Sequence, residues 1–331
     1  MELEEFNGLR ALVVGDVMID AYSRGVVERM SPEAPVPIVS LQEHFRRLGG
    51  AANVAVNLKA LGAEPLVCSI IGDDEAGKTL IQLMQEQGLD VAGLVSSNRR
   101  RTTVKHRVLD GSRQLLRIDE EDCFDLTDVE HSILCLVIQQ ALDKVPVDVV
   151  VLQDYNKGVL TEGLIRKVIA LCQERHIPVV VDPKKKNFFA YQGATLFKPN
   201  AKELREGLGV KAETPEELRQ AMLNLQERLH CEFLMVTLSD KGVIILHDGD
   251  FHHVDAHPRN IVDVSGAGDT VLSVAALCVA LKDASNASAT VLPETIAALS
   301  NIAGGLVCET SGVVPIDKKR FAEEVKRLCH E

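Results

Sequence analysis

An alternation of apolar runs with longer helical patterns constrains the fold of this chain more than any other feature. The apolar runs are short and typical of buried strands, and helical patterns separate most of them. Such an alternation predicts a parallel sheet whose strands are joined by right-handed helical crossovers. The predicted strands lie at 11–15, 65–71, 147–152, 177–181, 195–197 and 233–237, with an antiparallel extension at 242–246 and 250–254. The predicted helices lie at 48–61, 75–87, 126–142, 161–174, 266–282, 293–308 and 317–329. We expect a doubly wound, mostly parallel α/β sheet with helices on both faces.

Two segments break this alternation and predict a small β-sheet lid. Residues 20–41 contain three prolines and an alternation around Val36 and Ile38, which favours an edge strand. Residues 102–119 also alternate and turn at Asp110–Gly111, a hairpin signal. We expect a single domain over residues 1–331 with both segments inserted as a lid. Because an exposed strand edge tends to be paired or covered, we also expect a homodimer formed through the lid.

The composition argues against several classes of partner. The 331 residues carry a formal net charge of −12, which disfavours nucleic acid or an anionic membrane as the main partner. No apolar stretch approaches the roughly 18 residues of a membrane span, and the acidic first residues lack the apolar core of a signal peptide. The eight cysteines are scattered without a C-x-x-C pair, as in a reducing compartment. We therefore expect a cytoplasmic protein.

The segment Asp263–Thr270, which reads Asp-Val-Ser-Gly-Ala-Gly-Asp-Thr, precedes an apolar run that predicts a buried helix. Its glycines leave bare backbone at the first helical turn, where unpaired N–H groups and a partial positive charge bind anions. Asp269 lies beside this predicted anion site. Its carboxylate either caps the helix or acts as a base that takes a proton from a hydroxyl attacking a phosphoryl group. The local sequence does not separate these two interpretations.

Polar residues follow the predicted strands at their carboxyl ends, which converge on one crevice in an open α/β sheet. Asp16 and Asp20 follow the first strand, and Gly49 and Gly50 open a helix on which Asn53 is either a ligand or a solvated residue. Several lysines among the remaining residues would offset the overall acidity and favour a phosphorylated ligand. These residues are Asp154, Asn156, Lys157, Asp182, Lys184–Lys186, Lys198, Asn200, Glu203, Thr237, Ser239 and Gly242.

The pair Asn200 and Glu203 also has two interpretations. Asn followed three residues later by Glu is a good capping box for a helix start. Alternatively, Glu203 holds Mg²⁺ through water, because this ion keeps several waters and takes few carboxylates. The chain contains no P-loop, no dinucleotide-binding glycine motif and no zinc-binding pattern of His or Cys residues.

Taken together, these motifs resemble the ribokinase-like (PfkB-type) sugar kinases. The two signatures of that family match at Gly49–Asn53 and Asp263–Thr270, with the Asn200–Glu203 and Thr237–Gly242 motifs between them in the family's order. The resemblance implies an ATP-dependent kinase in which Asp269 is the catalytic base and Gly266, Ala267 and Gly268 form the anion hole. It implies sugar binding by Asp16, Asp20, Gly49, Gly50, Asn53 and Asp154. It assigns the nucleotide to Lys198, Asn200, Glu203, Thr237, Ser239, Gly242, Gly266 and Gly268, with Asn200 and Glu203 holding Mg²⁺ through water.

Further segments resemble the heptose 7-phosphate kinases within this family, which phosphorylate the anomeric hydroxyl of their sugar. These segments are 31–37, 49–55, 154–158, 182–184 and 198–200. Candidate ligands of the 7-phosphate are Arg107, Arg117, Lys157 and Lys186. One departure concerns Lys185, which stands where these kinases tend to have glycine. The chain stops after the kinase segment, so the resemblance is to the stand-alone form.

Two alternatives to this substrate stay open in the sequence. The first is the same chemistry on another sugar or a nucleoside. The second is a catalytically silent sensor of sugar or nucleotide on the same scaffold, which the presence of Asp269 with both glycines disfavours. Some members of the family use a monovalent cation. Whether this chain uses one stays open in the sequence.

Overall fold

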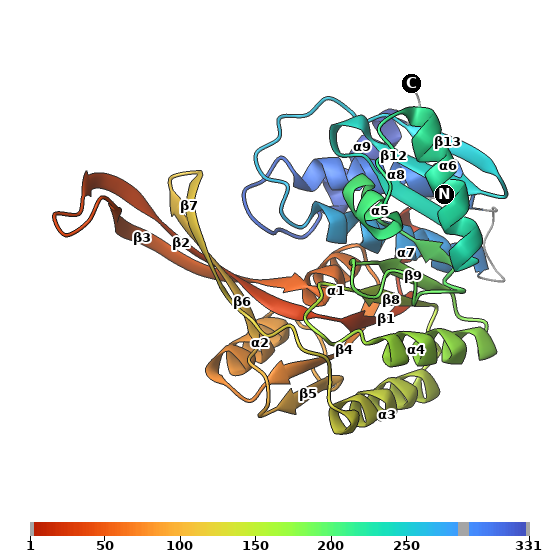
Figure 1. The fold of residues 1–331 in the computed structure, drawn as a ribbon, viewed down its shortest axis with the longest axis horizontal. Helices are drawn as coiled ribbons and strands as arrows, with labels where there is room; N and C mark the ends of the chain where they lie inside the picture. The colour runs from red at the N-terminus through yellow and green to blue at the C-terminus, as the bar shows by residue number, and fades with distance from the viewer. Residues whose placement is uncertain (1–2, 284–290, 329–331) are drawn as a thin grey trace.

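The computed structural model describes residues 3–283 and 291–328 and is built on a nine-stranded sheet (Figure 1). The strand order is β13-β12-β11-β10-β9-β8-β1-β4-β5, with parallel pairing from β11 to β5 and antiparallel pairing of β12 with both β11 and β13. The strands are β1 (Arg10–Gly15), β4 (Glu64–Gly72), β5 (Leu94–Ser97), β8 (Val149–Gln153), β9 (Val179–Asp182), β10 (Leu196–Phe197), β11 (Phe233–Thr237), β12 (Val243–His247) and β13 (Asp250–Val254).

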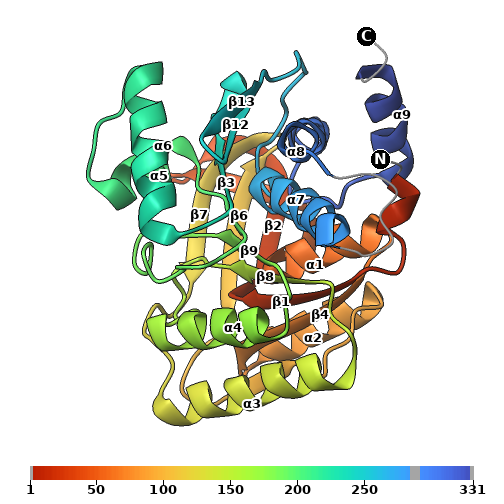
Figure 2. The ribbon, with the colours of Figure 1, turned by 90° about the vertical axis from the view of Figure 1, so that its right-hand side faces the viewer.

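Helices cover both faces of this sheet and divide the core into two clusters (Figure 2). Successive strand residues point to opposite faces, so Val13 packs into one cluster while Leu12 and Val14 pack into the other. One face carries α1 (Ala51–Ala60), α2 (Glu75–Glu86), α7 (Ala267–Asp283), α8 (Pro293–Val307) and α9 (Lys318–Leu328). The other carries α3 (Asp128–Lys144), α4 (Glu162–Glu174), α5 (Ala201–Leu208) and α6 (Pro215–Leu229). Two short 3₁₀ turns, η1 (Leu3–Phe6) and η2 (Ser239–Lys241), complete the elements.

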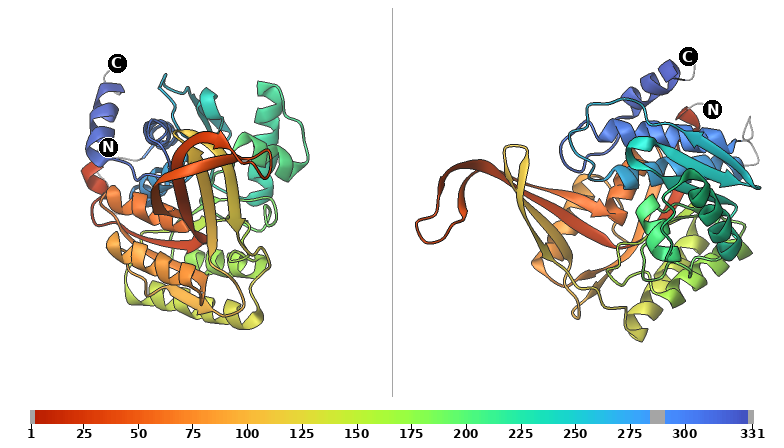
Figure 3. Two further views of the ribbon diagram at one scale, coloured as in Figure 1. Left: turned by 90° about the vertical axis from the view of Figure 1, so that its left-hand side faces the viewer. Right: turned by 45° about the horizontal axis from the view of Figure 1, so that its top comes forward.

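A second sheet of four strands forms an arm that projects from the body (Figures 1 and 3). Its order is β3-β2-β6-β7, built from β2 (Val17–Met30), β3 (Pro37–Gly50), β6 (Thr103–Asp110) and β7 (Arg113–Glu120). β2 and β3 form a long antiparallel hairpin, and β2 pairs in parallel with β6. We call this sheet the lid. At the inner end of the lid, β2 follows β1 almost directly and β3 leads into α1. Lid residues near this end therefore lie at the carboxyl edge of the main sheet.

The structure confirms the doubly wound parallel sheet, its antiparallel extension and the separate small sheet. It corrects the boundaries of the lid, because β2 begins at Val17 and β3 continues to Gly50 rather than ending near residue 41. Gly49 and Gly50 therefore end a lid strand, and helix α1 begins only at Ala51. The prediction missed strand β5 and helix α6. The final predicted helix ends as α9 at Leu328, and its predicted last residue, Cys329, lies outside the described residues.

No helix in the described part of the chain is both long enough and apolar enough to cross a membrane.

Candidate active site

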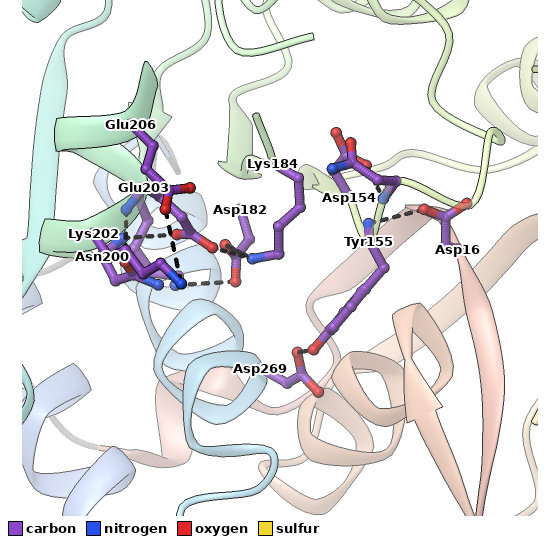
Figure 4. A network of polar contacts seen from close by, with 12 residues as sticks. Asp16, Asp154, Tyr155, Asp182, Lys184, Asn200, Lys202, Glu203, Glu206 and Asp269 are labelled. Carbon is purple, nitrogen blue, oxygen red and sulfur yellow. Dashed lines mark hydrogen bonds and ion pairs between the residues drawn. The ribbon is translucent and has the colours of Figure 1, made fainter. Parts of the chain in front are cut away.

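The candidate site lies at the carboxyl edge of the main sheet, beneath the inner end of the lid. Strands β1, β8, β9 and β10 run in parallel, so the residues that follow them gather at one edge. The first turn of α7 faces this edge, where Gly268 approaches Asp182 and Lys198. Figure 4 shows the polar contacts that link these segments. The predicted convergence of strand ends, lid and α7 is thus present in the fold.

The start of α7 has the geometry of an anion site. Gly266 has φ 81°, a conformation that favours glycine, and a Cβ atom there would lie 3.1 Å from Nδ2 of Asn53. Helix α7 then begins at Ala267, and its first intrahelical bond joins the N–H of Thr270 to the carbonyl of Gly266 at 3.0 Å. The N–H groups at the start of an α-helix have no intrahelical partner and favour negative charge. The backbone at Ala267 and Gly268 can therefore receive phosphate oxygens.

Asp269 is buried in the first turn of α7, and both of its carboxylate oxygens accept hydrogen bonds. Asn53 donates from Nδ2 to Oδ2 at 2.7 Å, and the hydroxyl of Tyr155 donates to Oδ1 at 2.9 Å. Burial raises the pKa of Asp269 to about 6, although these two donors lower it. A carboxylate with a pKa near 6 is mostly ionised at neutral pH and is a stronger base than an exposed aspartate. Its contacts reach from the helix into the site, unlike those of a capping residue.

Asn53 is held in place by the helix on which it lies. Asn57, one turn later in α1, donates to the carbonyl and to Oδ1 of Asn53 at 2.9 and 3.2 Å. The helix itself starts at Ala51, whose N–H bonds the carbonyl of Asp16 at 2.9 Å. Gly50 has φ 60° and leaves no room for a side chain against that carbonyl. Gly50 thus lets the end of β3 pass close to Asp16, the residue that follows β1.

A cleft of about 1060 Å³ opens beside the start of α7. It is large enough for a nucleotide-sized ligand. Ala267, Gly268 and six other residues predicted to bind the nucleotide line it, namely Lys198, Asn200, Glu203, Thr237, Ser239 and Gly242. Gly266 does not line the cleft and lies against Asn53 instead.

Further residues line the cleft wall beyond those that the resemblance assigned to the nucleotide. They are Tyr155, Asp182, Lys184, Arg259, Asn301 and the glycines 304 and 305 among others. The sequence placed Asp182 and Lys184 at the converging strand ends, where lysines favour a phosphorylated ligand, but it gave neither of them a specific contact. Arg259 follows the last strand by several residues, so its position could be found only from the fold.

Asn200 and Glu203 form the capping box of α5. The side chain of Asn200 accepts from the N–H of Glu203 at 2.8 Å, and Glu203 accepts from the N–H of Asn200 at 2.9 Å. The second carboxylate oxygen of Glu203 is an ion-pair partner of Lys184, inside the cleft. The capping interpretation therefore describes these residues correctly, and it leaves Glu203 in contact with the cleft as well.

Three further charged side chains form a network across the cleft from α7. Lys198 pairs with Asp182 at 3.0 Å, and both side chains are almost fully buried. Lys184 contacts Glu203 and lies 3.8 Å from Asp182. Burial by itself would lower the pKa of Lys184, but the carboxylates of Asp182 and Glu203 raise it above its usual value. Lys184 thus stays cationic beside the anion site. Lys185, the residue that departs from the family pattern, and its neighbour Lys186 are both exposed.

Oxygen ligands at this end of the cleft fit the chemistry of Mg²⁺. Asn200 and Glu203 offer amide and carboxylate oxygens, and Asp182 adds a carboxylate on the same wall. In the described ranges 3–283 and 291–328, no cluster of three or more His, Cys, Asp or Glu side chains is spaced to enclose a metal ion. An ion held by one or two carboxylates, water and phosphate oxygens matches this arrangement.

Asp16 and Asp154 are buried and hold the loop that follows β8. The carboxylate of Asp16 accepts the N–H groups of Tyr155, Lys157 and Val159 at 2.8, 3.0 and 3.1 Å. Asp154 accepts from the hydroxyl of Tyr191 at 2.8 Å, and burial raises its pKa to about 6. These bonds fix the backbone from which the Tyr155 ring extends toward Asp269 (Figure 4).

The predicted basic ligands of a sugar phosphate lie in two places and all have acidic partners. Arg107 projects from β6 and pairs with Asp20 of β2, and Gly49 leaves the space that this aspartate occupies. Arg117 donates twice to Asp119 on the same strand, at 2.8 and 3.0 Å. Lys157 pairs with Glu121 at 2.7 Å. Lys186 pairs with Asp125 at 2.7 Å and is exposed. Asp20 lies near enough to the site for its charge to act on Tyr155, and Arg107 pairs with it, whereas Lys186 does not line the cleft.

A buried carboxylate on the first turn of an anion-binding helix, with Ala267 and Gly268 of that turn lining a nucleotide-sized cleft, is the arrangement of an enzyme that transfers a phosphoryl group to a hydroxyl. The chain belongs to the pfkB family of carbohydrate kinases, whose description matches residues 9–319. It is an ATP-dependent sugar kinase.

Curated relatives carry the name Bifunctional protein HldE. The protein from Mesorhizobium japonicum is 37% identical over 94% of this chain and 60% of its own length. The protein from Methylobacillus flagellatus is 40% identical over 95% of this chain and 63% of its own length. That of Helicobacter pylori is 35% identical over 93% and 69%. The chain thus spans about 60 to 69% of the length of these relatives.

Solved structures share the fold. Phosphofructokinase-2 from Escherichia coli, in complex with potassium, superposes with a TM-score of 0.79 at 20% identity, covering 98% of this chain and 99% of that one. Arabidopsis thaliana ribokinase, complexed with ribose and ATP, gives a TM-score of 0.73 at 19% identity, covering 96% and 99%. At these identities the likeness concerns the fold alone.

Proposed function

We propose that this kinase transfers the γ-phosphoryl group of ATP to the anomeric hydroxyl of D-glycero-β-D-manno-heptose 7-phosphate. The products are the 1,7-bisphosphate and ADP, on the route to the ADP-heptose of the lipopolysaccharide core. The observation that carries the chemistry is the position of Asp269, which is buried in the first turn of α7 and contacts Asn53 and Tyr155. The choice of sugar is supported by the five segments that resemble heptose 7-phosphate kinases and by the similarity to the HldE proteins.

The reaction is an in-line displacement at the γ-phosphorus. Asp269 accepts the proton of the sugar hydroxyl as the oxygen attacks, which leaves no positive charge on the new phosphate ester. The N–H groups at the start of α7 receive the negative charge that spreads over the transferring oxygens. Lys184 and Lys198 lie across the cleft and offset the charge of the nucleotide phosphates. Asn200 and Glu203 would hold Mg²⁺ through water, and the bound ion would supply further charge compensation.

The sugar lies between the lid and the strand ends. Asn53 orients the carboxylate of Asp269, and Asp20 with Gly49 shapes the lid side of the pocket. Asp16 and Asp154 act on the sugar through the loop that they hold, since their oxygens already accept N–H or O–H groups. Arg107, Arg117, Lys157 and Lys186 remain the sequence-based candidates for the 7-phosphate, each with an acidic partner that the phosphate would have to compete with.

The test of the chemistry is the substitution Asp269→Asn, which keeps the shape and removes the base. We expect kcat to fall by about two orders of magnitude or more, the scale of general-base catalysis, while ATP and sugar still bind. Asp250→Asn, an exposed carboxylate of β13, is the control and should keep normal turnover. Near-normal turnover of the Asp269 variant would remove the assignment.

The test of the substrate is a panel of sugars, sugar phosphates and nucleosides with detection of ADP. Heptose 7-phosphate should give the highest kcat/KM. A clear preference for an unphosphorylated ketose or a nucleoside would assign the kinase to another sugar. Binding of sugar or ATP without ADP production on any acceptor would favour a sensor on this scaffold. Repeating the assay with sodium in place of potassium tests the use of a monovalent cation.

Assembly and location complete the proposal. The lid exposes apolar side chains, among them Met30, Val36, Leu41, Leu116 and Ile118, and its edge strands β3 and β7 have no further strand beside them in the lid sheet. A second copy of the chain would cover this surface, giving a homodimer through the lid. A cytoplasmic location agrees with the seven cysteines that remain free thiols in the described residues.

A further inference from the structure

Lys105 lies on the site-facing side of the lid with its charge unpaired. It belongs to β6, directly beside Asp20 of β2 and opposite Asp119 of β7 in the strand register. The side chain is partly buried, and its Nζ lies 4.9 Å from the centroid of the Tyr155 ring. This ring is the one whose hydroxyl reaches Asp269. Lys105 therefore stands one aromatic ring away from the proposed base.

The carboxylates near Lys105 are already paired with other cations. Asp20 pairs with Arg107, and Asp119 accepts two N–H bonds from Arg117. Glu121, whose charge also acts on Lys105, pairs with Lys157 at 2.7 Å. Within residues 3–283 and 291–328, no ion pair joins Lys105 to a carboxylate, although its ammonium group does contact the Tyr155 ring. The cluster Asp20, Lys105, Arg107, Arg117 and Asp119 thus carries one excess positive charge.

Holding this charge without a partner costs free energy. Burial lowers the pKa of Lys105 and is the largest effect; the carboxylates of Asp20 and Glu121 raise this pKa, and the cations Lys157 and Arg117 lower it. An anion placed beside the ammonium group would recover this cost. It would also meet the guanidinium groups of Arg107 on β6 and of Arg117, which lies opposite Arg107 on β7. Phosphate is the group that pairs most strongly with such a cluster, because charge-assisted hydrogen bonds to it are short and several can form together.

We propose that Lys105 binds the phosphate group of the acceptor sugar, at the end opposite the hydroxyl that Asp269 deprotonates. The assignment rests on the proposed function for the sugar itself. The Tyr155 side chain lies between Lys105 and Asp269, because its ring contacts the first and its hydroxyl the second. A sugar lying along that ring would present its hydroxyl to Asp269 and its phosphate to Lys105. The nucleotide phosphates are bound elsewhere, since Lys105 does not line the cleft that contains Lys184 and Lys198.

The substitution Lys105→Met tests this assignment by removing the charge and keeping most of the length. We expect KM for heptose 7-phosphate to rise about a hundredfold, the loss typical of truncating one partner of a desolvated charge pair. The same heptose without its phosphate should react equally well with both proteins, because Lys105 has nothing to pair with there. Lys105→Arg should recover part of the affinity. Lys78→Met, at an exposed lysine of α2, is the matched control.

An equal loss on phosphorylated and unphosphorylated sugar would show that Lys105 only supports the lid, and an unchanged KM would exclude it from the site; either result overturns the assignment. Failure of the proposed function has a different signature, namely that the wild-type protein does not turn over heptose 7-phosphate.

In that case, the wild-type protein and the same variants are compared for thermal stabilisation by inorganic phosphate, with the cleft saturated by a non-hydrolysable ATP analogue. Loss of that stabilisation in Lys105→Met alone supports the phosphate site, and equal stabilisation of both proteins overturns it.

Discussion

The hydroxyl of Tyr155 donates a hydrogen bond to Oδ1 of Asp269 at 2.9 Å and occupies one of the two oxygens that could accept a proton. Asn53 occupies the other oxygen at 2.7 Å. A sugar hydroxyl that gives its proton to Asp269 must therefore share or replace one of these donors. Tyr155 is the better candidate for replacement, because Asn53 is itself held by Asn57. The contact also tunes the base, since a hydrogen bond to the ionised carboxylate lowers its pKa.

The substitution Tyr155→Phe should shift the pH dependence of the kinase. It keeps the ring that Lys105 and Lys184 contact but removes one donor to Asp269, so the pKa of Asp269 rises above about 6. Because the base must be ionised to work, the acidic limb of kcat/KM should move to higher pH, by about one unit for a hydrogen bond to a charged group. Tyr191→Phe, which removes a similar bond to Asp154, should leave this limb in place. A limb that stays fixed in both variants would contradict this role for Tyr155.

Asp269 should also make the protein less stable as the pH rises. Burial raises its pKa in the folded state to about 6, from 3.8 in an unfolded chain. A carboxyl group with a raised folded pKa binds more protons in the folded state, so its stabilising effect is full below about pH 4 and is lost by about pH 6. The difference corresponds to at most about 3 kcal/mol. Asp269→Asn removes this penalty, although it must also re-form the bond to Asn53.

We therefore expect the Tm of Asp269→Asn, relative to wild type, to be higher at pH 8 than at pH 4. The measurement is thermal unfolding across this range, with Asp250→Asn as the exposed control. A Tm difference that does not vary with pH would show that ionisation of Asp269 costs the fold nothing. Together with the loss of turnover, a stabilised variant would indicate that the site is built at the expense of stability.

The main sheet could be predicted from sequence because its strands are buried on both faces. Runs such as 149–152 have no polar residue, and the helices between them have regular apolar faces. Strand β3 could not be predicted in full, since residues 42–47 are mostly polar and exposed and lack the apolar pattern of a strand. Pairing with β2, rather than burial, makes this segment a strand. Strand β5 was missed for a related reason, because it is short and only partly buried at the sheet edge.

The candidate site was predictable where glycines mark it. Gly266 and Gly50 need backbone conformations that favour glycine, so their motifs point to a close approach that the structure contains. Tyr155 and Lys105 carry no such local signal. Their contact joins a lid strand to the loop after β8, and only the fold brings these segments together. The pairing of all four predicted phosphate ligands with carboxylates was likewise invisible in the sequence, because each partner is set by strand register or loop packing.

The apolar surface of the lid gives a prediction about assembly. Leu116 and Ile118 are 55% and 47% exposed on β7. If a second copy covers them, Leu116→Asp together with Ile118→Asp should turn the dimer into a monomer, because burying two carboxylates without partners is costly. Analytical ultracentrifugation at micromolar concentration measures this change. Leu136→Asp, at a leucine 59% exposed on α3, should leave the dimer intact. A wild-type protein that is already monomeric would refute the proposed assembly.

Arg259 connects the cleft wall to the last helix and should matter for both stability and ATP binding. Its side chain is 6% exposed, and it contacts Glu309 at 3.3 Å and Glu324 of α9 at 2.9 Å. Arg259→Met leaves these carboxylates without a buried partner, so we expect a loss of about 3 kcal/mol in the free energy of unfolding. Because Arg259 lines the cleft, KM for ATP should rise more than KM for the sugar. Arg327→Met removes an exposed contact to the same Glu324 and should cost less than about 1 kcal/mol. Denaturant unfolding and steady-state kinetics of the two variants measure these effects, and equal losses would show that burial of Arg259 adds nothing to the pair.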